Sequence, residues 1–389
     1  MVKNIFYIHR FPFNREAYIR DEFDFLLSEG YNVKYLDISH LLKKKQFVTN
    51  YREDLKQHIL YFSTQKEFNS FIGEKKDRSV IITDVGLLAN SAWMYLPIFK
   101  NRIPYILFEN SVLPKIKSTT KSEVASSGLK RVSLAKVLNK PTQLGQLFLA
   151  KRTINYPNLI VSSKPKLSSE KRSLCSKLTT IKKVASLDYF AAEETVLNSL
   201  IDEPYVVFID QYFVHHPDFK SKHIIDSFTA EQYYTELNNY LIAYENNNKI
   251  KVIVACHPRR SKEQESDFDK RFSLVYNQTA NLVKFADLVL VHFSTAINYA
   301  VIFNKPFILL SSNLFNGGNI IPKIQMFATY FEKECINISD ITSDTKIATS
   351  INTHVDTNTY KKYYEMFVNP QNSVNKTFRG LITEELAKL

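Results

Sequence analysis

The sequence predicts an α/β protein made of two domains, each built on a parallel β-sheet. Three observations support this prediction. The chain has 389 residues, which is more than one typical domain holds. Short apolar, β-prone runs alternate with segments of helical periodicity, as they do in βαβ units. Two of these runs end abruptly in polar side chains, and open α/β sheets bind ligands just beyond the carboxyl ends of their strands.

The first half begins with a β-prone run at 4–8. Residues 14–29 place Tyr18, Phe23 and Leu26 on one face of a predicted helix, which Gly30 ends. The segment 118–145 is rich in Ser, Thr and Lys and predicts a loop with one or two short basic helices. Further strands are predicted at 32–38, 59–62, 79–83, 104–108 and 158–162. We expect residues 1–175 to form a Rossmann-like first domain.

A second α/β series follows. Strands are predicted at 205–209, 251–256, 288–291 and 307–310, and helices at 229–247, 277–285 and 294–303. We expect residues 176–358 to form a Rossmann-like, nucleotide-binding domain. The end of the chain, 359–389, is predicted to be helical with a break at Pro370 and to pack back toward the first domain.

The composition restricts the class of protein. No apolar run approaches the roughly 20 residues of a membrane-spanning helix, and the N-terminus has the pattern of a first strand, not of a signal peptide. The three cysteines form no CxxC pair, so a cytoplasmic protein without disulfides is expected. The net charge of +12 indicates an anionic partner.

Part of this charge is local. Between Lys115 and Arg152 the sequence has nine Lys or Arg residues, and Glu123 is the only acid. Such a segment could hold the protein at an anionic membrane surface, which would make it a peripheral protein on the inner face of the cell membrane. The alternative is a charged loop that simply faces water.

The predicted strand at 251–256 is followed by His257, Pro258, Arg259 and Arg260. Proline cannot continue a central strand, so the strand must stop there. Arginine is suited to bidentate contacts with phosphate, and a histidine can donate a hydrogen bond to a leaving phosphate group. The alternative is a structural histidine next to surface arginines.

The predicted strand at 288–291 is followed by His292, Ser294 and Thr295, and then by a helix. Ser294 is placed as the N-cap, and free backbone N–H groups with two hydroxyls would bind an anion. A cap without a ligand is the alternative. The chain has only eight glycines and neither a GxGxxG nor a GxxxxGK[ST] motif, so these side chains would have to bind any phosphate.

The His257–Pro258 pair after one strand and the Ser294–Thr295 pair opening a later helix resemble bacterial sialyltransferases and the related Kdo-type transferases of capsule and lipopolysaccharide synthesis. Those are inverting GT-B enzymes, with two Rossmann-like domains facing a central cleft, that use CMP-activated 2-keto sugar acids. The resemblance implies that His257 contacts the CMP phosphate and assists its departure, and that Ser294 and Thr295 hold that phosphate.

The same family carries an acidic motif after a strand of the first domain, and its carboxylate is the general base. Glu109 is the closest match, although Asn110 and Ser111 depart from the pattern. Asp84, at the end of the predicted strand 79–83, is the rival candidate. Either residue could instead cap a helix.

Other loops follow predicted strands at ligand-binding positions. Asp210 and Gln211 are expected to hold a donor sugar or an acceptor, and the loop with Gly317 is expected to line the donor pocket. No DxD motif follows an obvious strand, and adjacent loop histidines are poor metal ligands, so we expect no metal and no cofactor beyond the donor substrate.

In the first domain, His9, Arg10 and Arg15 follow the first predicted strand. They are candidates for contact with an anionic acceptor, and a basic loop before a helix is the alternative.

The sequence therefore predicts a metal-independent inverting glycosyltransferase that moves a CMP-activated 2-keto sugar acid onto a surface-glycan acceptor, which is lipid-linked in our hypothesis. A UDP-sugar transferase or a nucleotide-sugar 2-epimerase of the same architecture is the alternative. A nucleic-acid-binding protein is a distant third hypothesis. Two observations argue against it: the aromatic residues follow the patterns of core residues, and no nucleic-acid-binding motif is present.

Overall fold

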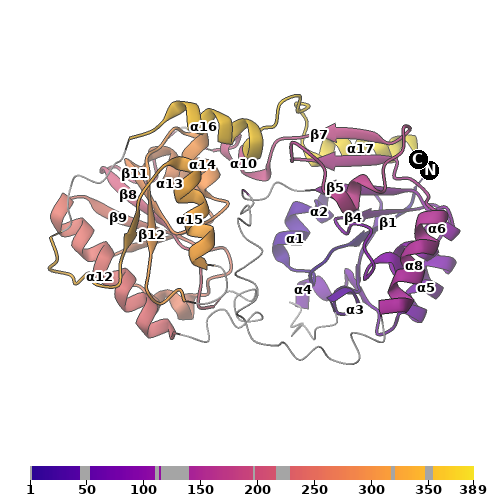
Figure 1. Cartoon of the computed structure of the whole chain (residues 1–389), viewed down its shortest axis with the longest axis horizontal. Coiled ribbons are helices and arrows are strands. Elements are labelled where there is room, and N and C mark those ends of the chain that lie inside the picture. Colours follow the sequence, from indigo (N-terminus) through magenta and orange to yellow (C-terminus); the bar gives the residue numbers. More distant parts are fainter. Residues whose placement is uncertain are drawn as a thin grey trace. The chain divides into compact units, whose positions relative to one another are not determined.

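The computed structural model describes residues 2–43, 53–109, 114, 140–195, 198–215, 228–316, 320–346 and 354–389. Among these residues the chain forms two compact units (Figure 1). The first contains the described residues up to 109, those from 140 to 184 and Asn372–Leu389, and the second contains Pro114 and Ala185–Gln371. The sequence placed the corresponding boundaries at 175/176 and 358/359.

The first unit contains a sheet of seven strands in the order β3-β2-β1-β4-β5-β6-β7, and every pair is parallel. Apolar β-prone residues dominate its central strands, which are buried on both faces. The strands are β1 (Asn4–Ile8), β2 (Asn32–Asp37), β3 (Ile59–Tyr61), β4 (Ser79–Thr83), β5 (Tyr105–Glu109), β6 (Leu159–Ser162) and β7 (Thr180–Lys183). The sequence predicted all of them except β7.

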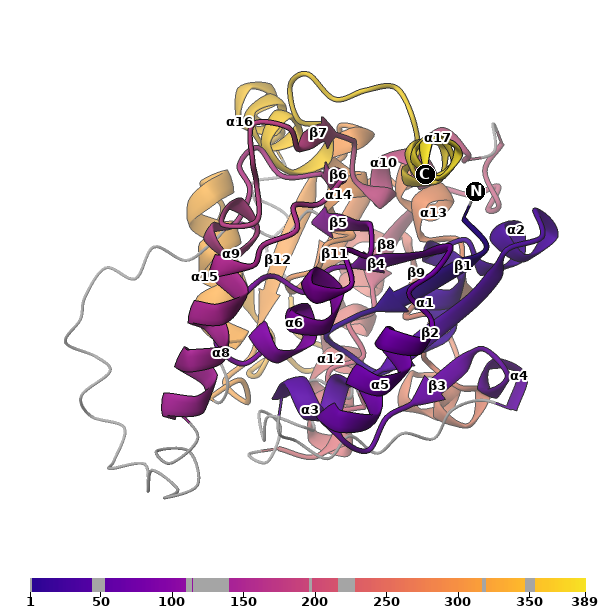
Figure 2. The ribbon, with the colours of Figure 1, turned by 90° about the vertical axis from the view of Figure 1, so that its right-hand side faces the viewer.

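Helices cover both faces of this sheet (Figure 2). On one face α5 (Gln65–Glu74), α6 (Ala92–Lys100) and α8 (Lys140–Arg152) pack on side chains such as Phe6 and Ile8. On the other face α17 (Phe378–Lys388) packs on the layer that contains Ile5 and Tyr7. The remaining helices are α1 (Arg15–Arg20), α2 (Phe23–Ser28), α3 (Ser39–Lys43), α4 (Glu53–Lys56) and α9 (Ser169–Arg172). The last helix thus completes the core of the first unit.

The predicted helix at 14–29 is interrupted, which corrects the sequence prediction. Asn14 caps α1 by accepting a hydrogen bond from the backbone N–H of Ala17, as expected for an N-cap. The chain then leaves the helix at Asp21, and Glu22 adopts a left-handed backbone conformation with φ of 56° before α2 begins. The interruption allows Asp21 to face His9 at the end of β1.

The second unit contains a parallel sheet of six strands in the order β10-β9-β8-β11-β12-β13. The strands are β8 (Tyr205–Ile209), β9 (Lys251–Cys256), β10 (Ser273–Tyr276), β11 (Leu288–Val291), β12 (Phe307–Ser311) and β13 (Cys335–Asn337). The four central strands agree with the prediction. The edge strands β10 and β13 were not predicted, because they are short and only partly buried.

The helices of the second unit complete its core. A capping box of Thr229 and Gln232 starts α12 (Ala230–Asn248). The other helices are α10 (Leu187–Glu193), α13 (Thr279–Phe285), α14 (Ile297–Ile302), α15 (Ile320–Phe331) and α16 (Thr357–Tyr363), with a 3-10 turn at Lys262–Asp267 and a π-helical turn at Tyr364–Val368. None of the described helices is long and apolar enough to cross a membrane.

Candidate functional site

In the second unit the strand order reverses between β8 and β11, which are neighbours in the sheet. Ligands of open α/β sheets bind beyond the carboxyl ends of strands at such a reversal. Gln211, just after β8, accepts a hydrogen bond at 2.6 Å from the backbone N–H of Phe293, just after β11. The two loops that the sequence singled out are therefore joined directly.

Asp210 connects the loop after β8 with the loop after β9. Its carboxylate is buried and accepts hydrogen bonds from the backbone N–H of Tyr212 at 2.8 Å and of His257 at 3.3 Å. It also accepts one at 2.8 Å from Nε of Arg260. The sequence predicted that Asp210 binds a substrate, but in the structure its oxygens hold the two loops in place.

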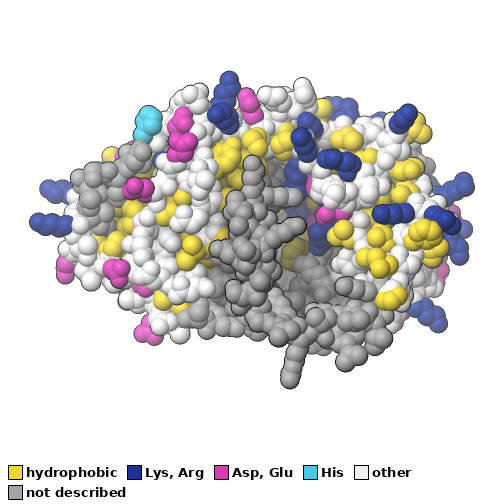
Figure 3. All heavy atoms as spheres, viewed as in Figure 1, with side chains coloured by type: hydrophobic (Ala, Val, Ile, Leu, Met, Phe, Trp, Pro, Cys, Tyr) yellow, Lys and Arg dark blue, Asp and Glu magenta, His cyan; other side chains and the backbone are white. Residues whose placement is uncertain are grey.

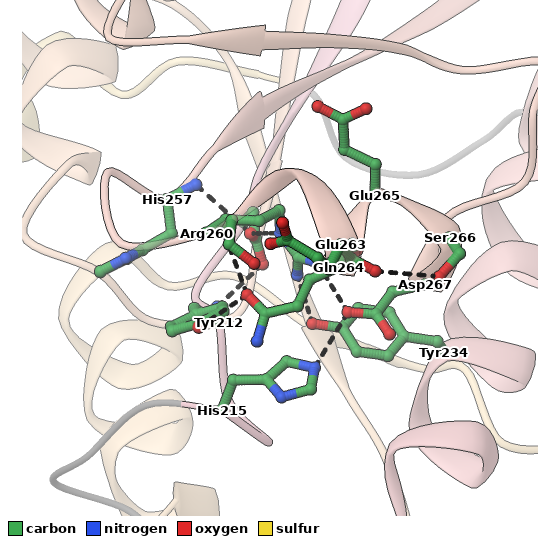
Figure 4. A network of polar contacts seen from close by, with 12 residues as sticks. Tyr212, His215, Tyr234, His257, Arg260, Glu263, Gln264, Glu265, Ser266 and Asp267 are labelled. Atoms are coloured by element: carbon green, nitrogen blue, oxygen red, sulfur yellow. Dashed lines mark hydrogen bonds and ion pairs between the residues drawn. The ribbon is translucent and has the colours of Figure 1, made fainter.

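Arg260 is the cation that balances this buried carboxylate (Figure 4). Its side chain is fully buried, and Nη1 donates to the Asp267 carboxylate and to the Gln264 carbonyl, each at 2.7 Å. Nη2 donates to the hydroxyl of Tyr234. Burial opposes the charge of Arg260, but Asp210 more than offsets it and raises its pKa above the ordinary value. Arg260 is thus a buried structural cation.

His257 follows β9 and keeps a partly exposed side chain. Its ring stacks on the Tyr212 ring, with 5.3 Å between the centroids and 11° between the planes. The backbone N–H of Arg259 donates to Nδ1 of His257 at 3.1 Å. Because Nδ1 accepts this bond, the neutral imidazole carries its proton on Nε2.

The remaining predicted donor-site residues differ in exposure. Pro258 and Thr295 are exposed, and Arg259 and Ser294 are partly exposed. Ser294 is not the N-cap that the sequence predicted, because α14 begins only at Ile297 and Ala296 occupies the cap position. The Ser294 Oγ instead accepts from the backbone N–H of Ala296 at 3.2 Å. A six-residue helix with this start gives no support for an anion site formed by its N–H groups.

The structure does not support a donor-binding role for two further predicted residues, Gly317 and His292. Gly317 lies outside the described residues. His292 is completely buried, its Nε2 is 3.0 Å from the Tyr233 hydroxyl, and its Nδ1 is 2.8 Å from the Leu310 carbonyl. Burial lowers the pKa of His292 to about 4, so the ring is neutral. In this structure His292 packs in the core and offers no surface to a ligand.

The first unit has the same arrangement at its own reversal, between β1 and β4. His9 follows β1, and its buried ring lies between Asp21, at 2.5 Å from Nε2, and Asp84, at 3.5 Å from Nδ1. Burial disfavours the charged ring, but the two carboxylates outweigh that effect and raise the pKa of His9 to about 9. His9 is therefore a buried cation at neutral pH.

The two candidate bases have different environments. The Asp84 side chain is 29% exposed and accepts from the backbone N–H of Arg10 at 3.2 Å. The Glu109 side chain is 3% exposed, pairs with Lys164 at 2.8 Å, and accepts from the backbone N–H of Ser168 at 3.1 Å. Burial opposes ionisation of both groups, but the adjacent cations and hydrogen-bond donors lower both pKa values. Asp84 is thus an accessible carboxylate and Glu109 a buried, paired one.

The two arginines predicted to bind an acceptor have different contacts. Arg10 pairs with Glu170 at 2.9 Å and keeps a 36% exposed side chain. Arg15 begins α1 and lies over the Tyr18 ring at 4.7 Å. A third cation, Lys171, was not predicted: it donates to the Phe108 carbonyl at 2.7 Å, and burial lowers its pKa to about 8.

Asp21 is the main structural residue of these sites that the sequence did not indicate as a candidate. A signal for Asp21 was present, because it lies three residues after Tyr18 on the apolar side of the predicted helix. For Arg260 the sequence predicted a phosphate contact, with a surface position as the alternative, whereas its side chain is fully buried and pairs with Asp210 and Asp267.

No group of three or more His, Cys, Asp or Glu side chains suited to a metal ion occurs among the residues that the structure describes. The expected independence from metal stays a prediction.

No protein-family model matches the sequence, and no curated protein matches it significantly. Among solved structures the chain is similar to the calicheamicin glycosyltransferase CalG4, with a TM-score of 0.52, 9% identity, and 100% of this chain and 98% of that chain covered. It also matches the wall teichoic acid polymerase TagF (TM-score 0.48, 11% identity, coverage 99% and 89%) and MurG of Acinetobacter baumannii (0.45, 11%, coverage 100% and 100%). The last two scores are too low to support an argument. Together with the two parallel sheets, the CalG4 match confirms the predicted GT-B fold.

Replacing Arg260 with Met should destabilise the second unit by about 3–5 kcal/mol, because the Asp210 carboxylate would stay buried without its cation. Chemical unfolding followed by circular dichroism measures this loss. Trp93, the only tryptophan, lies in the first unit, and its fluorescence transition should shift less. The control is Arg271→Met, whose 42% exposed side chain makes only ion pairs of 3.6 and 3.9 Å and should change stability by less than about 1 kcal/mol. Equal losses in the two variants would contradict this role for Arg260.

The stability contributed by His9 should depend on pH. Its pKa in the folded protein, about 9, exceeds the ordinary 6.5, so its contribution is complete below pH 6.5 and is lost as the pH rises through 9. The difference in unfolding free energy between wild type and His9→Gln should therefore shrink over this range, by about 3 kcal/mol at most. The Trp93 fluorescence transition measures it. Lys171 titrates in both proteins and cancels in the difference, and a difference that stays constant with pH would show that His9 is not charged.

Proposed function

We propose that this chain is an inverting glycosyltransferase whose second unit binds a nucleotide-activated sugar and whose first unit binds the acceptor. The observation that carries the proposal is the state of His257. This histidine stands at the carboxyl end of β9, and its Nδ1 accepts the Arg259 N–H, so the proton of the neutral ring is on Nε2. A fixed N–H donor at a strand end is what a departing phosphate requires.

The proposed chemistry at the donor forms one bond and breaks one. An acceptor oxygen attacks the anomeric carbon, and the bond from that carbon to the phosphate oxygen breaks. Negative charge then grows on the phosphate, and the hydrogen bond from Nε2 of His257 strengthens as it does. Hydroxyls of the partly exposed Ser294 and the exposed Thr295 are the further donors that we assign to this phosphate.

We assign the general base to Asp84 over Glu109. A base must reach the proton of the acceptor hydroxyl. Asp84 is ionised and partly exposed, and its neighbour His9 carries a positive charge that can stabilise the carboxylate. Glu109 is buried, and each of its two carboxylate oxygens already accepts a hydrogen bond, one from Lys164 and the other from the Ser168 N–H.

For the donor we propose a CMP-activated 2-keto sugar acid, with a lipid-linked surface glycan as the acceptor class. CMP leaves with a single phosphate, which needs no glycine-rich loop, and the chain has no GxGxxG or GxxxxGK[ST] motif. The resemblance at His257–Pro258 and Ser294–Thr295 supports the same donor. A UDP-sugar is the competing donor.

The donor is tested by thermal stabilisation with nucleotides. CMP should stabilise the protein by about 2.7 kcal/mol at a hundredfold excess over its Kd, whereas UDP at equal concentration should have little effect. The advantage of CMP over cytidine should disappear in His257→Ala, because that variant lacks the donor to the phosphate. Stabilisation by UDP alone would rule out the CMP donor but keep a nucleotide site, and strong salt-sensitive binding of single-stranded oligonucleotides instead would contradict the enzyme assignment.

The base is tested by a pair of isosteric variants. Asp84→Asn should lower kcat for sugar transfer by about 10²–10⁴-fold, because its amide cannot take the proton, while nucleotide stabilisation is kept. Glu109→Gln should lower the thermal stability of the first unit, because Lys164 loses its partner, and should affect kcat less. A larger loss of kcat in Glu109→Gln at full folding would transfer the role to Glu109.

A further inference from the structure

Helix α8 carries large apolar side chains on its outward surface. Leu144 is 58% exposed, and Phe148 and Leu149 are each 53% exposed. Lys151 and Arg152, at the end of the same helix, are also exposed. We refer to these five residues as the α8 face. In the view of Figure 3, hydrophobic side chains lie beside Lys and Arg side chains over this part of the first unit.

The α8 face is not the side by which the helix is held. Leu147 and Ala150 point into the core that α8 shares with α5 and α6, and Ala150 is completely buried. Leu144 and Phe148 are four residues apart and therefore lie on one side of the helix. The helix thus has an apolar inner side that packs in the core and a second apolar surface that remains exposed among the described residues.

The charges along α6 and α8 have one sign. The sequence has no Asp or Glu from 85 to 108, which includes α6, or from 124 to 169, which includes α8. Lys100 and Arg102, at the end of α6, are exposed. The side-chain amide of Asn155, after α8, donates to the Ile103 carbonyl at 3.2 Å, so the ends of the two helices are neighbours.

The cations and the apolar side chains of the α8 face are also in direct contact. The Arg152 guanidinium lies 4.3 Å from the centre of the Phe148 ring. An arginine that covers an aromatic ring can keep its charge at a polar boundary while the ring enters an apolar layer. This combination is typical of helices that lie in the interface of a membrane.

We propose that the α8 face attaches the first unit to an anionic lipid bilayer. Leu144, Phe148 and Leu149 enter the boundary between headgroups and acyl chains, and Lys151 and Arg152 contact anionic headgroups. The sequence suggested such a surface for 115–152, of which 115–139 lie outside the described residues. The inference does not depend on the proposed transfer reaction.

A bilayer accounts for the α8 face better than a nucleic acid does. Nucleic acids use cations and stacked aromatic rings, and they gain nothing from exposed leucines. The absence of acids along both helices complements a surface of uniform negative charge, such as a leaflet rich in anionic lipid. A second copy of this chain would carry the same positive charge on the same face.

Vesicle sedimentation with the full chain tests the proposal. The protein should bind vesicles of phosphatidylcholine mixed with phosphatidylglycerol and should bind vesicles of phosphatidylcholine alone much more weakly. The triple variant Leu144→Gln, Phe148→Gln, Leu149→Gln should lower the partition coefficient at least about tenfold, because it removes the inserted apolar groups. Lys151→Gln with Arg152→Gln should lower it by roughly tenfold, and only on the anionic vesicles.

Matched variants distinguish binding through the α8 face from nonspecific adsorption to vesicles. Leu178→Gln with Ile181→Gln removes exposed apolar side chains elsewhere in the first unit, and Lys75→Gln with Lys76→Gln removes two other exposed cations. Both should bind vesicles like wild type, and all variants should melt like wild type. The proposal is overturned if the α8 variants bind anionic vesicles as strongly as wild type does, or if wild type does not bind anionic vesicles. It is also overturned if the triple variant abolishes only self-association or oligonucleotide binding.

Discussion

The buried pair of Arg260 and Asp210 is the interaction on which the candidate donor site depends. Both side chains are completely removed from solvent, and such a pair is tolerable only when every remaining donor and acceptor has a partner. Asp210 meets this condition by accepting the backbone N–H groups of Tyr212 and His257. The carboxylate that compensates the buried arginine thereby also holds the first residues of two loops. One of these residues is His257.

The first unit also contains a buried cation that is compensated by carboxylates, but the residues differ. At its strand reversal the buried cation is His9, and Asp21 and Asp84 supply the compensating charge. In each unit one carboxylate accepts a backbone N–H from the loop after the neighbouring strand: Asp84 from Arg10, and Asp210 from His257. The two carboxylates differ in exposure, because Asp210 is sealed by Arg260 whereas Asp84 keeps part of its surface. That difference makes Asp84 available for chemistry.

The sequence predicted the sheets well because their central strands are continuous apolar runs, which need no knowledge of partners. It also located the polar strand ends, since a run that stops at Pro258 or Asp84 does so in any parallel fold. It failed where a side chain's environment is set by distant residues. The break in the helix 14–29 accompanies the contact of Asp21 with His9, a residue that propensity within the helix does not take into account.

The same limit explains why the strand-end residues divide into two groups that look alike in sequence. His292 and His257 both follow buried strands, yet His292 lies against Tyr233 and the Leu310 carbonyl in the core, while His257 stays partly exposed on Tyr212. Burial makes the first histidine neutral and inaccessible. In the second, a local backbone N–H donates to Nδ1, so the neutral ring carries its proton on Nε2. A chemical role at a strand end therefore requires a side chain that stays accessible and is held in one orientation, and the residue type alone specifies neither.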